Sequence, residues 1–198
     1  LGLDEAIKDS IKRSRYVLLV FTGEWCRYCK EFDENVLHRS KFVSFVKDKF
    51  AYLRVDIPKN YYSAPINEYE QEAFKLRVKL DVETFPTIFI LDRSGKPLVR
   101  SGYRRGSEDA WKRYLLKKVK YLQELEVLCR KIESAPSKQG ALRIAVNALA
   151  SHGKAPIPFL TFFAETVFAH SRLVEDKSML QAALVLCAHT SCYKTRNR

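Results

Sequence analysis

One stretch constrains the fold more than any other: Cys26 and Cys29 stand between an apolar run and an amphipathic run. Residues 16–21 (YVLLVF) are typical of a buried strand, and residues 30–37 carry apolar side chains at helical spacing. The N-terminus of a helix presents unpaired N–H groups and a partial positive charge, which favour a thiolate. The spacing therefore predicts a redox-active pair on one helical turn, close enough to form a Cys26–Cys29 disulfide.

The other cysteines do not extend this pair into a metal centre or a disulfide scaffold. The chain has five cysteines in 198 residues, too few for a disulfide-stapled fold of this length. A zinc site would need two more ligands, and there is no second Cys-x-x-Cys and no histidine pair, so we expect no metal. Cys129 lies on the apolar face of a helical pattern, and we expect it to be a thiol of the core. We expect Cys187 and Cys192 to be unpaired, with a second disulfide between them as the open alternative.

Composition and charge argue against a nucleic-acid partner and against a membrane span. The formal net charge is +12, and it is spread along the chain: 27 Lys/Arg face 20 Asp/Glu before residue 135, and eight face three after it. Since no nucleic-acid-binding motif accompanies the charge, we expect a solvated basic surface and no nucleic-acid partner. Hydrophobic residues make up 46% of the chain, but no apolar run reaches the roughly 20 residues that cross a bilayer. The sequence predicts a globular protein without a membrane span.

The order of patterns predicts an α/β fold. We expect a helix at 3–14, a strand at 16–21, helices to 37 and at 41–49, and a strand at 51–57. A helix capped by Asn67, a strand at 87–91, a turn, an edge strand at 97–101 and a long helix at 108–132 follow. Ser40 is the expected N-cap of the helix at 41–49. A βαβ unit followed by a ββα unit gives one mixed sheet with helices on both faces.

A domain boundary is expected in residues 134–140 (SAPSKQG), which are small and polar and contain Pro and Gly. Residues 1–134 would then form the domain that carries the cysteine pair. Residues 135–198 show helical patterns alone, at 141–150, 158–172 and 178–188, and predict an all-α extension of unknown role.

Three features, taken in order, resemble the thioredoxin superfamily over about residues 6–132. The first is the strand, the Trp-Cys-x-x-Cys of residues 25–29 and the helix behind it. The second is Phe-Pro-Thr at 85–87, ahead of a strand, which matches the cis-proline loop of the family. The third is Gly102, where the family has a glycine beside the active site. The longer stretch EWCRYCKEF at 24–32 is similar to bacterial envelope disulfide reductases of the DsbD C-terminal-domain and DsbH types.

The resemblance implies a thioredoxin-like fold and a thiol–disulfide oxidoreductase, in the first place a protein-disulfide reductase. Cys26 would be the nucleophile and Cys29 the resolving thiol, with no cofactor. The implied partners are disulfide-containing protein substrates and an upstream thiol electron donor. Together with a chain that starts at Leu1 instead of Met, the resemblance places the protein in the periplasm or otherwise outside the cytosol, the cytoplasm being the alternative.

Substrate-contacting residues are expected on both sides of the pair. Arg27 adds a cation beside the sulfur, and Tyr28 shapes the surface that partners meet. If the proline is cis, the backbone at Phe85 is free to pair with an extended substrate strand. The full expected set is Trp25, Arg27, Tyr28, Phe85, Pro86 and Gly102.

Two departures from the thioredoxin pattern leave the direction of electron flow open. Thioredoxins carry a buried Asp six residues before the first cysteine, where this chain has Val20, and often a Lys on the second strand, where Tyr52 stands by our alignment. Proton transfer from Cys29 would then use water or a surface group such as Glu24. The alternatives are therefore a disulfide oxidase or isomerase, or a thioredoxin-fold scaffold whose C-terminal helices bind a partner protein.

Overall fold

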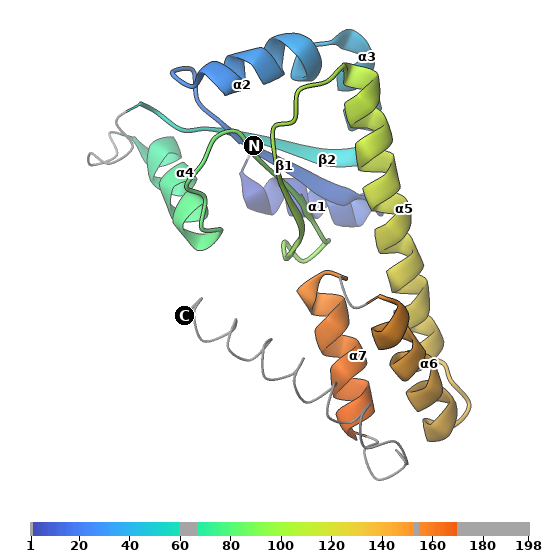
Figure 1. Cartoon of the computed structure of the whole chain (residues 1–198). Coiled ribbons are helices and arrows are strands. Elements are labelled where there is room, and N and C mark those ends of the chain that lie inside the picture. The colour runs from blue at the N-terminus through green and yellow to red at the C-terminus, as the bar shows by residue number, and fades with distance from the viewer. Residues whose placement is uncertain (1, 60–66, 153–154, 170–198) are drawn as a thin grey trace. The chain divides into compact units, whose positions relative to one another are not determined.

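The computed structural model describes residues 2–59, 67–152 and 155–169 (Figure 1). Helices and strands alternate through its first half, and helices alone follow, which confirms the predicted α/β class with C-terminal helices. The elements are α1 (Leu3–Lys12), β1 (Tyr16–Thr22), α2 (Arg27–Phe32), a π-helical turn η1 (Asp33–Leu37), α3 (Ser40–Lys49), β2 (Phe50–Asp56), α4 (Glu68–Lys79), β3 (Thr87–Leu91), β4 (Pro97–Gly102), α5 (Glu108–Glu133), α6 (Lys138–Ser151) and α7 (Ile157–Ala169).

The four strands form one mixed sheet in the order β2-β1-β3-β4. Strand β1 pairs in parallel with β2 and antiparallel with β3, and β4 continues the antiparallel side. All seven residues of β1 are buried, because this inner strand is covered on both faces. The sequence of a strand that is covered on both faces is a continuous run of apolar residues without alternation, as in β1.

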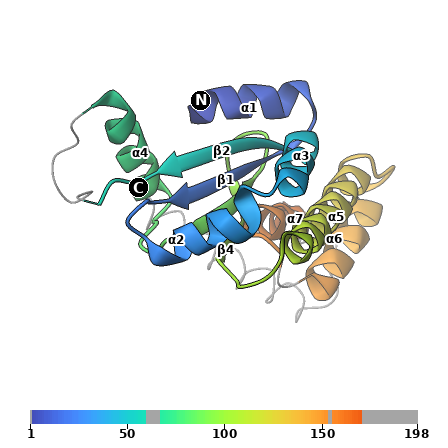
Figure 2. The ribbon, with the colours of Figure 1, turned by 90° about the horizontal axis from the view of Figure 1, so that it is seen from above.

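The two faces of the sheet have separate cores. Alternate residues of the strands, such as Val17, Leu19 and Leu53, pack with Ala6 of α1 and Ala73 of α4. The opposite face carries α2, α3 and the start of α5. Figure 2 shows α1 and α2 on opposite sides of the β1–β2 pair. The cysteine helix is tied to this second face by aromatic packing of Phe32 on Trp111, whose ring centroids are 4.8 Å apart.

The chain divides into two compact units, residues 1–118 and 119–198, with the dividing point inside α5. In the second unit, α6 and α7 pack together, and Leu122, Leu125, Ala145 and Phe163 are fully buried. The predicted boundary at 134–140 coincides with the break between α5 and α6, and as a domain boundary it stays a prediction. The predicted third helix, with Cys187 and Cys192, lies outside the described residues.

One local expectation needs correction. Arg39 is the N-cap of α3, and Ser40 is already its first residue, without a side-chain capping bond. The pairing of β4 with β3 extends to Gly102, opposite Thr87, and the ladder is irregular at Ile90/Leu91. There Pro97 stands opposite Leu91, and a proline has no N–H to donate to the ladder.

Candidate redox site

The two cysteines lie at the N-terminus of α2. Cys26 is the N-cap, with extended backbone, and its Sγ accepts a hydrogen bond from the backbone N–H of Cys29 at 3.2 Å. Both are free thiols. Cys26 is 8% exposed and Cys29 is 1% exposed, so Cys26 is the more accessible sulfur although the protein encloses both. The start of α2 thus directs a backbone N–H at the sulfur of Cys26.

The loop before β3 holds Cys26 from the other side. The thiol of Cys26 donates to the carbonyl oxygen of Phe85 at 3.5 Å, and the Phe85–Pro86 peptide bond is cis. Gly102 lies beside this loop: a Cβ built on it would be 3.9 Å from the carbonyl oxygen of Pro86, an ordinary contact. The structure therefore brings Phe85, Pro86 and Gly102 to the cysteine pair, but it does not require glycine at residue 102.

Trp25 forms a wall of the site. Its ring nitrogen Nε1 donates to the carbonyl oxygen of Ile57 at 2.8 Å, and its ring meets Phe85 edge to face at 5.5 Å. A Cβ at Gly23 would lie 2.7 Å from Nε1 and 2.9 Å from the Ile57 oxygen, closer than real Cβ atoms come. Gly23, which the sequence suggests only as part of a turn, is thus needed to let the indole reach the backbone after β2.

The residues between the cysteines face solvent. Tyr28 is 54% exposed, Trp25 is 38% exposed, and Arg27 is also exposed. Arg27 lines a shallow pocket with Trp25, Lys30, Glu31 and Glu34. An exposed ring on each side of the N-cap sulfur forms a surface that another polypeptide can reach.

Cys29 lies in an environment that keeps it protonated. Burial raises the pKa of the Cys29 thiol well above its usual range, and a hydrogen bond with the Cys26 side chain raises it further. The negative charge of Asp33 acts in the same direction, while a backbone hydrogen bond with Gly23 opposes it. At neutral pH the inner sulfur is therefore a thiol, and it must lose a proton before it can attack a disulfide.

A cluster of charged residues that sequence reasoning missed lies behind the pair. Arg54 of β2 donates to both carboxylate oxygens of Asp33, with Nη1–Oδ1 at 2.6 Å and Nη2–Oδ2 at 3.1 Å. Its Nε also contacts Asp56 at 3.0 Å, and Thr22 donates to the Oδ1 of Asp56 at 2.5 Å. Burial disfavours the charge of Arg54, but hydrogen bonds to Asp56 and Asp33 outweigh it and hold the pKa of Arg54 above its usual value. Burial would raise the pKa of Asp56, but the hydrogen bonds that it accepts from Arg54 and Thr22 hold this pKa below its usual value.

This cluster lies beside the positions where the sequence departs from the thioredoxin pattern. Arg54 is the residue of β2 in register with Val20, and Tyr52 is in register with Leu18. Burial raises the pKa of Tyr52 to about 12. The carboxylate whose charge acts on Cys29 is Asp33, not the exposed Glu24. The sequence signal that could have found Asp33 is its spacing, because it follows Cys29 by four residues, about one helical turn.

Two further observations concern metals and membranes. Among residues 2–59, 67–152 and 155–169, no three His, Cys, Asp or Glu side chains are grouped so that they could hold a metal ion. Over the same residues, every helix is too short or too polar to cross a bilayer.

Comparison with known proteins identifies similar chains. Residues 3–117 match the profile of a family described as a thioredoxin-like domain. The curated protein "Disulfide bond reductase DsbH" of Chlamydia pneumoniae is 29% identical over 108 residues, which are 54% of this chain and 64% of that protein. This chain thus spans just under two thirds of that relative.

Two solved structures are also similar to this chain. One titled "DsbH Oxidoreductase" superposes with a TM-score of 0.52 at 28% identity, over 61% of this chain and 81% of its own. The oxidised C-terminal domain of DsbD from Neisseria meningitidis is 19% identical, with a TM-score of 0.42, over 58% of this chain and 91% of that chain.

Proposed function

The chain belongs to the thioredoxin-like family, and from this premise we propose that it is a thiol–disulfide oxidoreductase that reduces protein disulfides. The observation that carries the proposal is the pair itself: an N-cap sulfur, Cys26, receives a backbone N–H, and a buried, protonated thiol, Cys29, lies behind it. The similarity to a protein named a disulfide bond reductase supports the reducing direction.

In the first step the thiolate of Cys26 attacks one sulfur of a substrate disulfide. A bond forms between Cys26 Sγ and that sulfur, the substrate disulfide breaks, and the other substrate sulfur leaves and takes up a proton. Before attack, the backbone N–H of Cys29 at 3.2 Å and the N-terminus of α2 stabilise the negative sulfur.

In the second step Cys29 loses its proton and attacks Cys26 Sγ. The Cys26–Cys29 disulfide forms, and the second substrate sulfur leaves as a thiol after protonation. Two electrons pass from the pair to the substrate in total, so an upstream thiol donor must return the pair to the dithiol.

Asp33 is assigned an electrostatic part in this cycle. Both of its carboxylate oxygens accept hydrogen bonds from Arg54, so the carboxylate is held in place by its ion pair. Its charge nevertheless raises the pKa of Cys29. We therefore assign Asp33 the role of a fixed charge that adds to the effect of burial in keeping the resolving thiol protonated.

The substrate would lie across the N-cap sulfur. Trp25 and Tyr28 offer exposed rings, and Arg27 offers a cation. The loop at 85–86, with Gly102 beside it, offers backbone groups that an extended segment can pair with. Because the motif resembles that of envelope enzymes, we place the protein in the periplasm or another extracytoplasmic compartment, and we treat residues 135–198 as a separate helical extension.

The nucleophile is tested by turnover of insulin disulfides with dithiothreitol as donor. We expect the wild type to be active and Cys26→Ser to be inactive. Cys129→Ser is the matched control, since burial raises the pKa of Cys129 to about 11 and the mechanism gives it no role. Full activity of Cys26→Ser would show that the nucleophile is misassigned.

The direction is tested by the reduction potential of the pair, measured by equilibration with glutathione. A value near that of thioredoxin, about −270 mV, supports a reductase. A value near about −120 mV is that of a strong oxidant and would favour the oxidase alternative.

A further inference from the structure

Glu31 of α2 joins the cysteine helix to the segment that follows β4. Its Oε1 accepts a hydrogen bond from the hydroxyl of Tyr103 at 3.2 Å and another from Nε of Arg105 at 3.0 Å. The side chain of Glu31 is 26% exposed, and that of Arg105 is 72% exposed. One carboxylate oxygen thus holds two residues of the segment 103–107, which connects β4 to α5 without regular secondary structure.

Aromatic packing holds the same segment from the inside. The ring of Tyr103 lies 4.9 Å from the ring of Phe32 and stacks on Trp111, with centroids 6.4 Å apart and planes inclined by 8°. The indole nitrogen of Trp111 donates to the carbonyl oxygen of Arg104 at 2.9 Å. The ring and the backbone are therefore fixed by packing and by α5, whereas the side chain of Arg105 is held by Glu31.

This segment begins beside the redox pair. A Cβ built on Gly102, the last residue of β4, would lie 3.9 Å from the carbonyl oxygen of Pro86. The carbonyl oxygen of the preceding residue, Phe85, accepts the hydrogen bond from the thiol of Cys26. Residues 103–105 follow Gly102 directly, so they extend the polypeptide surface that borders the sulfur.

Glu31 also borders the exposed residues around the N-cap sulfur. It lines the shallow pocket that contains Trp25 and Arg27. An exposed ion pair contributes little to folding stability, because water screens both charges. Its contribution here is to order the long side chain of Arg105, which has many rotamers when it is free. Contact residues that are ordered in advance reduce the entropy lost when a partner binds.

We propose that Glu31 is a positioning residue for polypeptide substrates. It holds Tyr103 and Arg105 in the arrangement that an extended segment meets when it pairs with the backbone of Phe85. This role rests on the proposed function, since it concerns the step in which a substrate lies across Cys26. A small disulfide needs to reach only the sulfur, so Glu31 matters for protein substrates and not for small ones.

Steady-state kinetics of the full chain tests this role. In Glu31→Gln the charge is lost, while an amide oxygen remains for the hydroxyl of Tyr103. We expect the KM for insulin to rise about three-fold, the size of one exposed ion pair, with kcat unchanged. The rate at which Cys26 attacks dithiobisnitrobenzoate should equal that of the wild type. Arg105→Gln should raise KM by the same factor, and the double variant should raise it no further, because both residues act through one bond.

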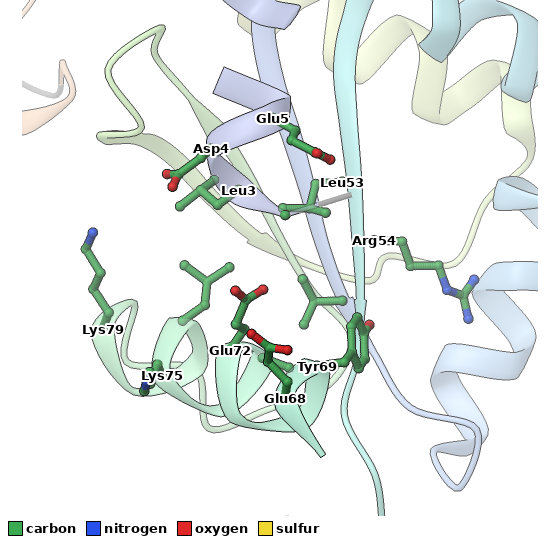
Figure 3. A pocket seen from close by; sticks show the side chains of 14 residues that line it. Leu3, Asp4, Glu5, Leu53, Arg54, Glu68, Tyr69, Glu72, Lys75 and Lys79 are labelled. Atoms are coloured by element: carbon green, nitrogen blue, oxygen red, sulfur yellow. The ribbon is translucent and has the colours of Figure 1, made fainter. Parts of the chain in front are cut away.

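Two charge-matched variants show whether the effect needs this bond. Glu5→Gln removes a charge from an exposed residue of α1 at the pocket that Figure 3 shows, on the face of the sheet opposite α2 (Figure 2), and should leave KM unchanged. Glu34→Gln removes a charge from the same shallow pocket as Glu31 and should change KM less. Equal increases in Glu34→Gln and Glu31→Gln would overturn the proposal. Additive increases in the double variant, or an equal loss of rate with insulin and with the small disulfide, would also overturn it.

Amide NMR gives a measurement that does not depend on turnover. Glu31→Gln should shift the signals of residues 102–106 and leave those of α1 in place. Unmoved signals at 103–105 would overturn the positioning role. If the wild type reduces neither insulin nor the small disulfide, the proposed function fails. If the wild type reduces both and Glu31→Gln has the same KM, the role of Glu31 alone fails.

Discussion

Replacing Asp33 by Asn separates two roles that a carboxylate near the resolving thiol could have. If Asp33 is a fixed charge, its removal lowers the pKa of Cys29, because burial and the Cys26 hydrogen bond remain while the charge is lost. Asp33 contributes less to this raised pKa than burial or the Cys26 side chain does, so its loss lowers the pKa of Cys29 by a small part of the whole shift. Each unit by which this pKa falls raises the thiolate fraction of Cys29 about ten-fold at neutral pH.

The rate gain is smaller than the gain in thiolate. Nucleophilicity falls with pKa, with a Brønsted coefficient of about 0.4–0.5, which removes about three-fold of each ten-fold gain in thiolate. The second step should therefore run faster in Asp33→Asn, by about three-fold for each unit by which the pKa of Cys29 falls. If Asp33 were instead the proton acceptor, its loss would slow that step by about 100-fold or more. The fixed-charge role thus predicts a faster second step, and the proton-acceptor role predicts a slower one.

Stopped-flow reduction of dithiobisnitrobenzoate resolves the steps, because attack by Cys26 and attack by Cys29 each release one thionitrobenzoate. We expect the first phase to be unchanged and the second to accelerate. Asp4→Asn is the control, since it removes the same charge from an exposed residue on the other face of the sheet. Circular dichroism checks the fold, because losing one partner of Arg54 costs about 1–3 kcal/mol. A second phase slowed ten-fold or more would refute the fixed-charge role.

Three other outcomes follow from the packing and the pKa of buried groups. The phenol of Tyr52 has a pKa near 10 in the unfolded chain and about 12 in the folded one, so the free energy of unfolding should fall by up to about 2.7 kcal/mol between these pH values. Urea titrations should show that Tyr52→Phe does not have this loss. Gly23→Ala puts a methyl group against the Trp25 indole, so we expect about 1–3 kcal/mol of destabilisation and a changed tryptophan fluorescence; an unaltered spectrum contradicts the packing. Leu125→Ala should cost about 2–5 kcal/mol of unfolding free energy in the helical unit, and a cost below about 1 kcal/mol would mean that Leu125 is not in a packed core.

The sequence was sufficient for the elements whose causes are local. The continuous apolar run of β1 predicts a strand covered on both faces, and all its residues are buried. Asn67 predicts the start of α4, and its side chain accepts the N–H of Glu70 at 2.8 Å. The cysteine pair was expected at the start of a helix because the change from strand to helical periodicity occurs there.

The features that the sequence did not predict depend on contacts between distant residues. In the sequence, Arg54 is a polar residue of an alternating strand, and only the fold brings it to Asp33, 21 positions earlier. The bond from Trp25 to the backbone of Ile57 spans 32 positions. The division of the chain inside α5 is equally invisible, because helical periodicity runs through it without a change. Spacing predicts what a segment forms but not which partners it meets.

The hydrogen bond from the Cys26 thiol to the Phe85 carbonyl couples two events that are usually considered separately. While the sulfur keeps its proton, it occupies an acceptor that the backbone of an incoming strand would need. When the proton leaves, the sulfur becomes reactive and stops donating to the Phe85 carbonyl in the same event. Deprotonation thus activates the nucleophile and ends its hydrogen bond to Phe85 at the same time. A segment that pairs with the backbone of Phe85 therefore meets an activated sulfur.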